Sequence, residues 1–303
     1  MDMIQEAIKR AREERSALAQ EKEKTEAGEQ GEAPPVPAEI QAADQMVEEY
    51  FREDTAVAAP LAATTASPAS GAAVAAGDIS YTKTRHVELN DKHLAENRVI
   101  AGLDYDRRVE AYRQLRTQVL KVLKDNGWNT LAITSPGENA GKSLTATNLA
   151  ISLSREVNHT VMLVDLDLRQ PSLHKMFDIT VEKGLIDYLN DEATLEEVLV
   201  NPGFQRLVLL PGRALGKYSS EILSSPQMKS LVRDISQRYA ERIIIFDLPP
   251  LLRNDDALMF TPTVDATLMV VEDGVTTTDD VLRSLQLLEG SKLIGTILNK
   301  ARS

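Results

Sequence analysis

The sequence of 303 residues contains no cysteine, which excludes disulfides, thiolate metal ligands, iron–sulfur clusters and thiol nucleophiles. It also lacks any run of about 18 apolar residues, so we expect no segment that spans a bilayer. Residues 1–24 are charged throughout and hold no apolar signal-peptide core. Positive charge is scarce: 34 Lys and Arg face 46 Asp and Glu, a net charge of −12 that argues against nucleic acid as a partner. We therefore expect a soluble, cytoplasmic protein.

Residues 1–85 differ in composition from the rest of the chain. Residues 1–54 hold 15 acidic and 7 basic side chains. Apolar residues at helical spacing predict a short amphipathic helix over about Met3–Leu18, and a second helix is possible over Ala38–Phe51. Residues 55–78 are rich in Ala, Thr, Ser and Pro, with too few bulky side chains to build a core, which predicts a disordered linker. The first helix is interpreted either as part of a solvated tail or as a docking segment for a partner.

From residue 86 onward, short apolar runs alternate with longer amphipathic stretches. The predicted strands are Thr130–Thr134, Val161–Asp165, Leu207–Leu210, Arg242–Asp247, Ala266–Val271 and Ile294–Leu298. The predicted helices are Ser143–Val157, Pro226–Tyr239 and Thr278–Leu288. The strand candidates are continuously apolar, so both faces of the sheet are expected to be buried. This alternation predicts an α/β fold over residues 86–303, with a doubly wound, mostly parallel sheet.

A phosphate-binding loop follows the first predicted strand. Residues 135–143 read Ser-Pro-Gly-Glu-Asn-Ala-Gly-Lys-Ser and run directly into a helical pattern, which is the context that a P-loop requires. Backbone N–H groups of such a loop converge on phosphate oxygens, and the helix N-terminus adds a positive dipole. Pro136 stands where the motif usually has its first glycine, with Gly137 one place later. The residues expected to contact the nucleotide are Gly137, Glu138, Asn139, Ala140, Gly141, Lys142, Ser143 and Leu144. The expected fold is therefore a SIMIBI-like P-loop domain.

Acidic residues close two of the predicted strands. Asp165 and Asp167 end the second strand, and Asp247 ends the fourth. Because the carboxyl ends of parallel strands share one edge with the P-loop, these carboxylates are expected beside a Mg²⁺–nucleotide, where they could hold the ion or accept a proton. Arg169 could help to neutralise phosphate charge. Asn299, after the last strand, could present its amide to a purine ring.

Together these residues resemble the bacterial tyrosine kinase family, P-loop autokinases of capsule and exopolysaccharide synthesis, over about residues 86–303. The most specific string is residues 164–174, Val-Asp-Leu-Asp-Leu-Arg-Gln-Pro-Ser-Leu-His, which matches the family's A′ motif, while Asp247 matches its B motif. The N-terminal part is similar to the cytoplasmic versions associated with exopolysaccharide gene clusters.

The resemblance implies an ATP-dependent protein-tyrosine kinase that uses Mg²⁺. Lys142 would position the phosphates, and Ser143, Asp165 and Asp247 would hold Mg²⁺. Either Asp165 or Asp167 would accept the tyrosine proton. A membrane-embedded polysaccharide co-polymerase or activator would recruit the protein to the inner face of the membrane. Glu110, Arg113 and Arg116 match the family's E-x₂-R-x₂-R motif, which implies self-association through one helical face.

Two features depart from the family pattern. Members usually end in a tyrosine-rich tail, whereas here the seven tyrosines are scattered and the last predicted strand is followed by Asn-Lys-Ala-Arg-Ser. Leu248 stands where a small hydroxyl residue is usual. Two alternatives therefore stay open: an ATP-binding scaffold without tyrosine phosphorylation, and a partitioning-type switch ATPase. Gly137 argues against the second, because those proteins carry an additional lysine there. Tyr81 and Tyr105 are the candidate phosphate acceptors.

Overall fold

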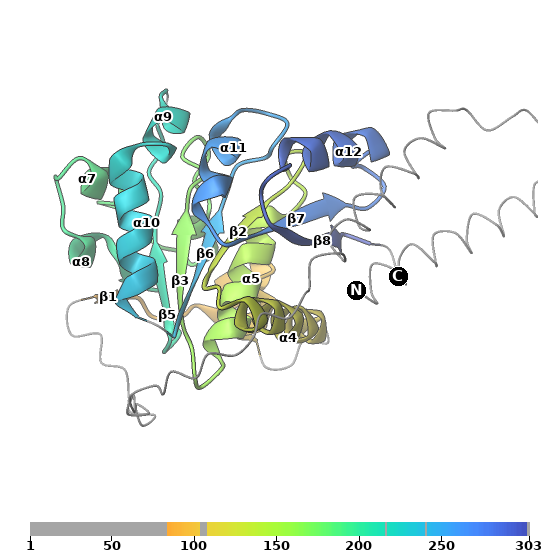
Figure 1. Ribbon diagram of the computed structural model, residues 1–303. Coiled ribbons are helices and arrows are strands. Elements are labelled where there is room, and N and C mark those ends of the chain that lie inside the picture. Colours follow the sequence, from red (N-terminus) through yellow and green to blue (C-terminus); the bar gives the residue numbers. More distant parts are fainter. Residues whose placement is uncertain (1–83, 104–107, 216, 240, 302–303) are drawn as a thin grey trace, which may run out of the picture. The chain divides into compact units, whose positions relative to one another are not determined.

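The computed structural model describes residues 84–103, 108–215, 217–239 and 241–301 (Figure 1). Eight strands form one sheet in the order β1-β4-β5-β3-β6-β2-β7-β8. Their bounds are β1 Arg85–His86, β2 Thr130–Thr134, β3 Thr160–Asp165, β4 Val200–Asn201, β5 Leu207–Leu210, β6 Arg242–Asp247, β7 Ala266–Glu272 and β8 Leu293–Asn299. All neighbouring strands pair in parallel except β4 and β5, which are antiparallel. The α/β fold with a mostly parallel sheet is therefore confirmed.

Helices cover both faces of the sheet. Their bounds are α3 Asp91–Glu96, η1 Ile100–Gly102, α4 Val109–Asn126, α5 Lys142–Ser154, α6 Leu173–Met176, α7 Leu185–Leu189, α8 Leu195–Val198, α9 Ser219–Leu223, α10 Pro226–Arg238, α11 Asp256–Phe260, η2 Thr261–Thr263 and α12 Thr278–Leu287. One apolar cluster joins α4 and α5 to alternate strand residues such as Leu131 and Leu163. The other joins α10 and α11 to the intervening residues, such as Ala132 and Met162. The alternation of side chains along each strand thus feeds two separate cores.

The register of the central strands brings chemically important residues to one edge. Asp165 of β3 is the register partner of Asp247 of β6, and Asp247 also pairs with Ile133 of β2. The P-loop leaves β2 at the same edge. In Figure 1 the central strands run upward, and α9 and α11 lie above their carboxyl ends. Because parallel strands end together, residues that are about 100 positions apart in the sequence become neighbours.

Several predicted elements need correction. β8 was expected to be buried on both faces, but it is the outer strand of the sheet, and Leu298 is 58% exposed. Helix α5 begins at Lys142 and ends at Ser154, so the predicted range of Ser143–Val157 was displaced toward the C-terminus. β1, β4 and the short helices were not predicted, because they are too short to show a periodic pattern in the sequence.

Some predictions lie outside the described residues. These are the two N-terminal helices, the linker over 55–78, and Tyr81 and Tyr105 as phosphate acceptors. The boundary proposed at residue 86 stays a prediction. Among the described helices, none combines the length and apolar character that crossing a membrane requires.

Candidate active site

The P-loop takes a tight backbone path between β2 and α5. Asn139 has φ +62° and Gly141 has φ +93°, both in the left-handed region. Gly141 caps the start of α5, and its carbonyl accepts a hydrogen bond from the Thr145 N–H at 2.9 Å. A Cβ atom at position 141 would lie 2.1 Å from Nδ2 of Asn299. Glycine is therefore required here both for its backbone conformation and for the close approach of Asn299.

The loop is fixed by the segment that follows β6. The Leu251 N–H donates to the Ser135 carbonyl at 2.8 Å, and the Leu252 N–H donates to the Pro136 carbonyl at 3.1 Å. The Ser135 hydroxyl donates to the carbonyl of Gly137 at 2.7 Å. Residue 136 contributes its carbonyl to these hydrogen bonds, and proline retains that group although it lacks the N–H. The replacement of the usual glycine is thus compatible with a formed P-loop.

Lys142 lies at the centre of the site. Its Nζ is 2.8 Å from Oδ2 of Asp167, 3.9 Å from Oδ1 of Asp247 and 3.1 Å from the hydroxyl of Ser143. Burial of the ammonium lowers its pKa, but Asp247, Asp167 and Asp165 more than offset this, so the pKa stands above its ordinary value. Lys142 therefore carries its charge at the point where the loop, β3 and β6 meet.

Asp165 and Asp247 are fully buried and only partly satisfied. Oδ2 of Asp165 accepts the N–H groups of Ser172 and Leu173, both at 3.0 Å. Oδ1 of Asp165 and both oxygens of Asp247 have no hydrogen-bond partner among the described residues. The Ser143 hydroxyl lowers the pKa of Asp247 without reaching hydrogen-bond geometry. A buried carboxylate without a partner costs free energy, so these oxygens mark a site for a cation.

Burial shifts both of these carboxylates in the same direction. Burial and then the charge of Asp247 raise the pKa of Asp165 to about 7, against the hydrogen bonds and Lys142, which lower it. Burial raises the pKa of Asp247 to about 6, although Lys142 lowers it. Asp165 and Asp247 are register partners on β3 and β6, and the charge of Asp247 helps to raise the pKa of Asp165, while the charge of Asp167 helps to raise the pKa of Asp247. A divalent cation would relieve this repulsion.

The donor set fits Mg²⁺. When ionised, Asp165, Asp167 and Asp247 exceed the single charge of Lys142 by two negative charges, which one Mg²⁺ neutralises. Among the described residues no group of three or more His, Cys, Asp or Glu side chains is arranged to hold a metal alone. Mg²⁺ commonly binds through one or two carboxylates, waters and substrate phosphates, so a hydroxyl from Ser143 and the carboxylates of Asp165 and Asp247 suffice.

The structure adds a residue that the sequence analysis missed, Asp256. This carboxylate is fully buried at the start of α11 and accepts two hydrogen bonds from Arg169, from Nε at 2.9 Å and from Nη2 at 3.2 Å. It also accepts the Ser219 hydroxyl at 2.7 Å. The Arg169 guanidinium is therefore hydrogen-bonded to Asp256 in this structure. Its contact with a phosphate stays a prediction. The only sequence signal for Asp256 is its position shortly after the fourth strand.

Three other predicted residues of the P-loop region have specific contacts. The Asn299 amide donates to the Ala140 carbonyl at 2.8 Å, so it holds the loop directly, and its contact with a purine stays a prediction. Glu138 accepts a hydrogen bond from Nε of Arg253 at 2.7 Å, across the outer side of the loop. Leu144 packs against the apolar core, so its backbone rather than its side chain faces the loop.

The predicted self-association residues lie on α4. Glu110 and Arg113 form an exposed ion pair at 3.4 Å. Arg116, in contrast, donates to the Ser152 carbonyl at 3.2 Å and pairs with Glu156 at 3.1 Å. Arg116 thus joins α4 to the end of α5 within one chain. The prediction that all three side chains point outward from one helical face is wrong for Arg116. Their role in self-association stays a prediction.

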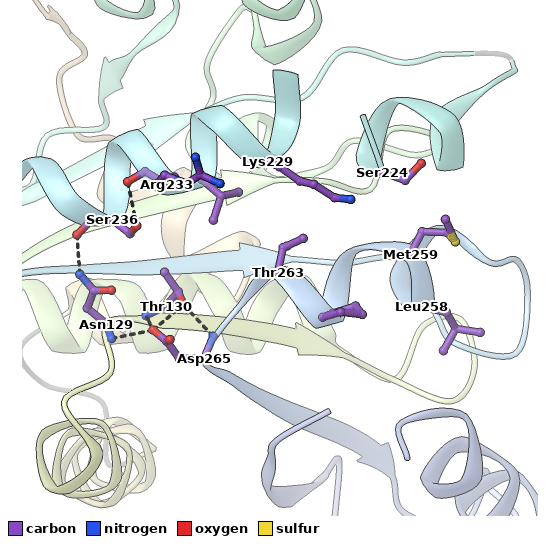
Figure 2. Close-up of a pocket in the computed structure, with 12 residues that line it drawn as sticks. Asn129, Thr130, Ser224, Lys229, Arg233, Ser236, Leu258, Met259, Thr263 and Asp265 are labelled. Carbon is purple, nitrogen blue, oxygen red and sulfur yellow. Dashed lines mark hydrogen bonds between the residues drawn. The ribbon is translucent and has the colours of Figure 1, made fainter. Parts of the chain in front are cut away.

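A cavity of about 620 Å³ lies away from this site (Figure 2). It runs between α10, which contributes Lys229 and Arg233, and the α11–η2 segment, which contributes Met259. Asp265 closes one end by accepting hydrogen bonds from the N–H groups of residues 129 and 130. None of the P-loop residues or the strand-end aspartates lines this cavity, so it is separate from the candidate active site.

Comparisons with known proteins agree with this geometry. Residues 131–303 match the CobQ/CobB/MinD/ParA nucleotide binding domain family. The chain is 31% identical over 192 residues to the tyrosine-protein kinase YwqD of Bacillus subtilis, covering 63% of this chain and 80% of that one. It is 30% identical over 194 residues to the tyrosine-protein kinase CpsD of Streptococcus agalactiae, covering 63% of this chain and 82% of that one.

A solved structure is also similar. The kinase domain of the Escherichia coli tyrosine kinase ETK has a TM-score of 0.61 and 28% identity, over 68% of this chain and 82% of that domain. The match to the curated Escherichia coli etk sequence covers only 29% of that longer protein, so the likeness there concerns its kinase part. By these matches the chain belongs to the CobQ/CobB/MinD/ParA nucleotide-binding family and, within it, to the bacterial tyrosine kinases.

Proposed function

We propose that this chain is an ATP- and Mg²⁺-dependent protein-tyrosine kinase that acts in exopolysaccharide or capsule synthesis. One observation carries the proposal. Lys142 of the P-loop lies within 3.9 Å of carboxylates from two different segments, Asp167 and Asp247, beside buried carboxylate oxygens that accept no hydrogen bond from the described residues. This is the arrangement that phosphoryl transfer from a Mg²⁺–nucleotide needs, and the related proteins are named tyrosine kinases.

Each residue has a distinct part in the proposed reaction. Lys142 and the backbone N–H groups of residues 137–144 would bind and orient the ATP phosphates. Ser143, Asp165 and Asp247 would hold Mg²⁺, which supplies charge neutralisation when bound. A carboxylate of Asp165 or Asp167 would accept the proton of the attacking tyrosine hydroxyl.

The proposal extends to location and partners. The protein would work in the cytoplasm and reach the inner face of the membrane through a membrane-embedded co-polymerase or activator. It would associate with copies of itself through Glu110, Arg113 and Arg116. The exposed Glu110–Arg113 pair supports that role better than Arg116, whose guanidinium is bound within the chain.

Incubation of the purified protein with ATP and Mg²⁺ tests the proposal. We expect phosphotyrosine on the protein, detected by antibody and by mass spectrometry, and its loss in the Lys142→Met variant. A matched control is Lys229→Met, which changes a lysine on α10 that lies away from the P-loop. Binding of ATP without phosphotyrosine or phosphate release would instead support an ATP-binding scaffold. Phosphate release without protein labelling would support a partitioning-type switch.

A further inference from the structure

We propose that Tyr218 is a phosphate acceptor, modified by the active site of a second copy of this chain. The inference rests on the proposed kinase function and names the substrate of that same site. It does not depend on a tyrosine-rich tail, and it concerns a tyrosine within the folded domain rather than Tyr81 or Tyr105.

Exposure separates the four tyrosines that the structure describes. Tyr218 is 69% exposed and Tyr239 is 50% exposed. Tyr188 packs against the apolar cluster beneath α7 and α8. Tyr112 faces α5, and burial raises the pKa of its phenol, although Thr145 and Asn148 lower it. A tyrosine side chain must project from the surface of its own molecule to enter the active site of another. Tyr218 and Tyr239 are therefore the accessible candidates among the described tyrosines.

Position then distinguishes these two. Tyr218 follows β5, whose carboxyl end lies beside that of β3. A Cβ on Gly212 would lie 2.9 Å from the Asp165 carbonyl, and the Leu215 N–H donates to the Leu168 carbonyl at 2.7 Å. Tyr239 instead precedes β6 at the opposite edge, where its ring is 4.2 Å from the Arg242 guanidinium carbon. Tyr218 is thus on the same rim as the phosphate site, so two copies that meet rim to rim would bring the phenol of one toward the phosphate site of the other.

The backbone at Tyr218 is unusual for its residue type. Its φ is +67°, in the left-handed region, where a bulky side chain is uncommon. The next residue, Ser219, starts α9 and donates its hydroxyl to the buried Asp256 at 2.7 Å. This anchor keeps the segment in place and holds the phenol outward. The ring of Tyr218 is exposed to solvent rather than packed.

The same anchors favour transfer between molecules. The segment is held on one side by Leu215 and on the other by Ser219, both bound to the rim that contains Arg169. These contacts hold the segment in one position, and the phenol that it carries is 69% exposed, so the active site of a second copy can approach it.

The proposed step balances with ATP as the phosphoryl donor. The Tyr218 phenol oxygen of the acceptor forms a bond to the γ-phosphorus of ATP on the donor. The bond from that phosphorus to the β–γ bridging oxygen breaks, and ADP leaves with the electron pair. The phenolic proton passes to Asp165 or Asp167 of the donor. The products are phosphotyrosine, ADP and a protonated carboxylate, which then loses its proton to water.

A two-chain assay tests this. The acceptor is a size-tagged full-length chain with Lys142→Met, which cannot label itself, and the donor is the untagged wild-type chain with ATP and Mg²⁺. We expect mass spectrometry to place phosphate on Tyr218 of the acceptor. Adding Tyr218→Phe to the acceptor should lower its labelling at least fivefold, whereas adding Tyr239→Phe should leave labelling unchanged. Unchanged melting temperatures would show that both acceptors are folded.

Three results would overturn the inference. Labelling of the acceptor at Tyr50, Tyr81, Tyr105 or Tyr239, with Tyr218 unmodified, would reject Tyr218 while leaving the kinase function in place. Absence of phosphotyrosine from both chains would reject the kinase function, and this inference with it. Labelling at Tyr218 that appears only on the wild-type chain and never on the acceptor would refute transfer between molecules.

Discussion

Replacing Asp247 by asparagine should stabilise the protein when no metal or nucleotide is bound. Asp247 is fully buried, its oxygens accept no hydrogen bond within the part of the chain that the structure describes, and its pKa is raised from 3.8 to about 6. A shift of roughly two units corresponds to about 3 kcal/mol above pH 6, since each unit is worth 1.36 kcal/mol. Because asparagine brings an amide that also needs partners, we expect a gain of about 1–3 kcal/mol, or roughly 2–10 °C in melting temperature.

The effect should depend on pH in one direction. Between about pH 4 and pH 6 the folded state keeps a proton on Asp247 that the unfolded state has released. The free energy of unfolding of the wild type therefore falls as pH rises through this window and stays lowered above it. Asparagine does not titrate, so its advantage should be full at pH 8 and largely absent at pH 4.

Thermal unfolding followed by circular dichroism, in EDTA and without nucleotide, measures this. Asp255→Asn, an exposed carboxylate near the same site, is the matched control and should change little. Adding Mg²⁺ and ATP should raise the melting temperature of the wild type but not that of Asp247→Asn. A lower melting temperature for Asp247→Asn than for wild type at both pH values would show that the carboxylate stabilises the fold, and the reasoning from burial would fail.

Three further substitutions have defined outcomes. Asn299→Ala removes the hydrogen bond to the Ala140 carbonyl, so isothermal titration should show weaker Mg²⁺–ATP binding by about fivefold, corresponding to about 1 kcal/mol. Arg116→Ala should lower the free energy of unfolding in urea by about 1–2 kcal/mol, whereas Arg113→Ala, whose ion pair is exposed, should change it by less than about 0.5 kcal/mol. Asp256→Ala leaves a guanidinium and a hydroxyl without their partner, so it should destabilise the fold by roughly 2–4 kcal/mol, and equal stability would contradict the bonding described here.

The sequence was most informative where one strong pattern decides the structure. Continuous apolar runs located β2, β3, β5, β6 and β7, because a parallel strand that is buried on both faces is mostly apolar. The spacing of Gly141, Lys142 and Ser143 after a strand predicted the P-loop, since few other structures need those residues in that order. The meeting of Lys142 with Asp167 and Asp247 followed from parallel strands ending at one edge.

Other features depend on contacts between distant segments and leave no local pattern. Asp256 is one carboxylate in an acidic loop, and only the fold shows that it binds Arg169 and Ser219. Arg116 shares a helical face with Glu110 in sequence terms, yet the packing of α4 on α5 uses it internally. The outer position of β8 could not be read from its composition, because an apolar strand at the edge of a sheet resembles an interior strand.

The way the P-loop is held has a consequence for how ligand affinity and folding are linked. Its carbonyls are bound by Leu251 and Leu252 after β6 and by Asn299 at the end of β8, so the loop is preorganised before any phosphate arrives. Little ordering entropy then remains to oppose binding. Substitutions that destabilise β6 or β8 far from the nucleotide should therefore weaken nucleotide affinity, because the P-loop becomes less ordered before binding. This should hold even where the substituted residue touches no ligand atom.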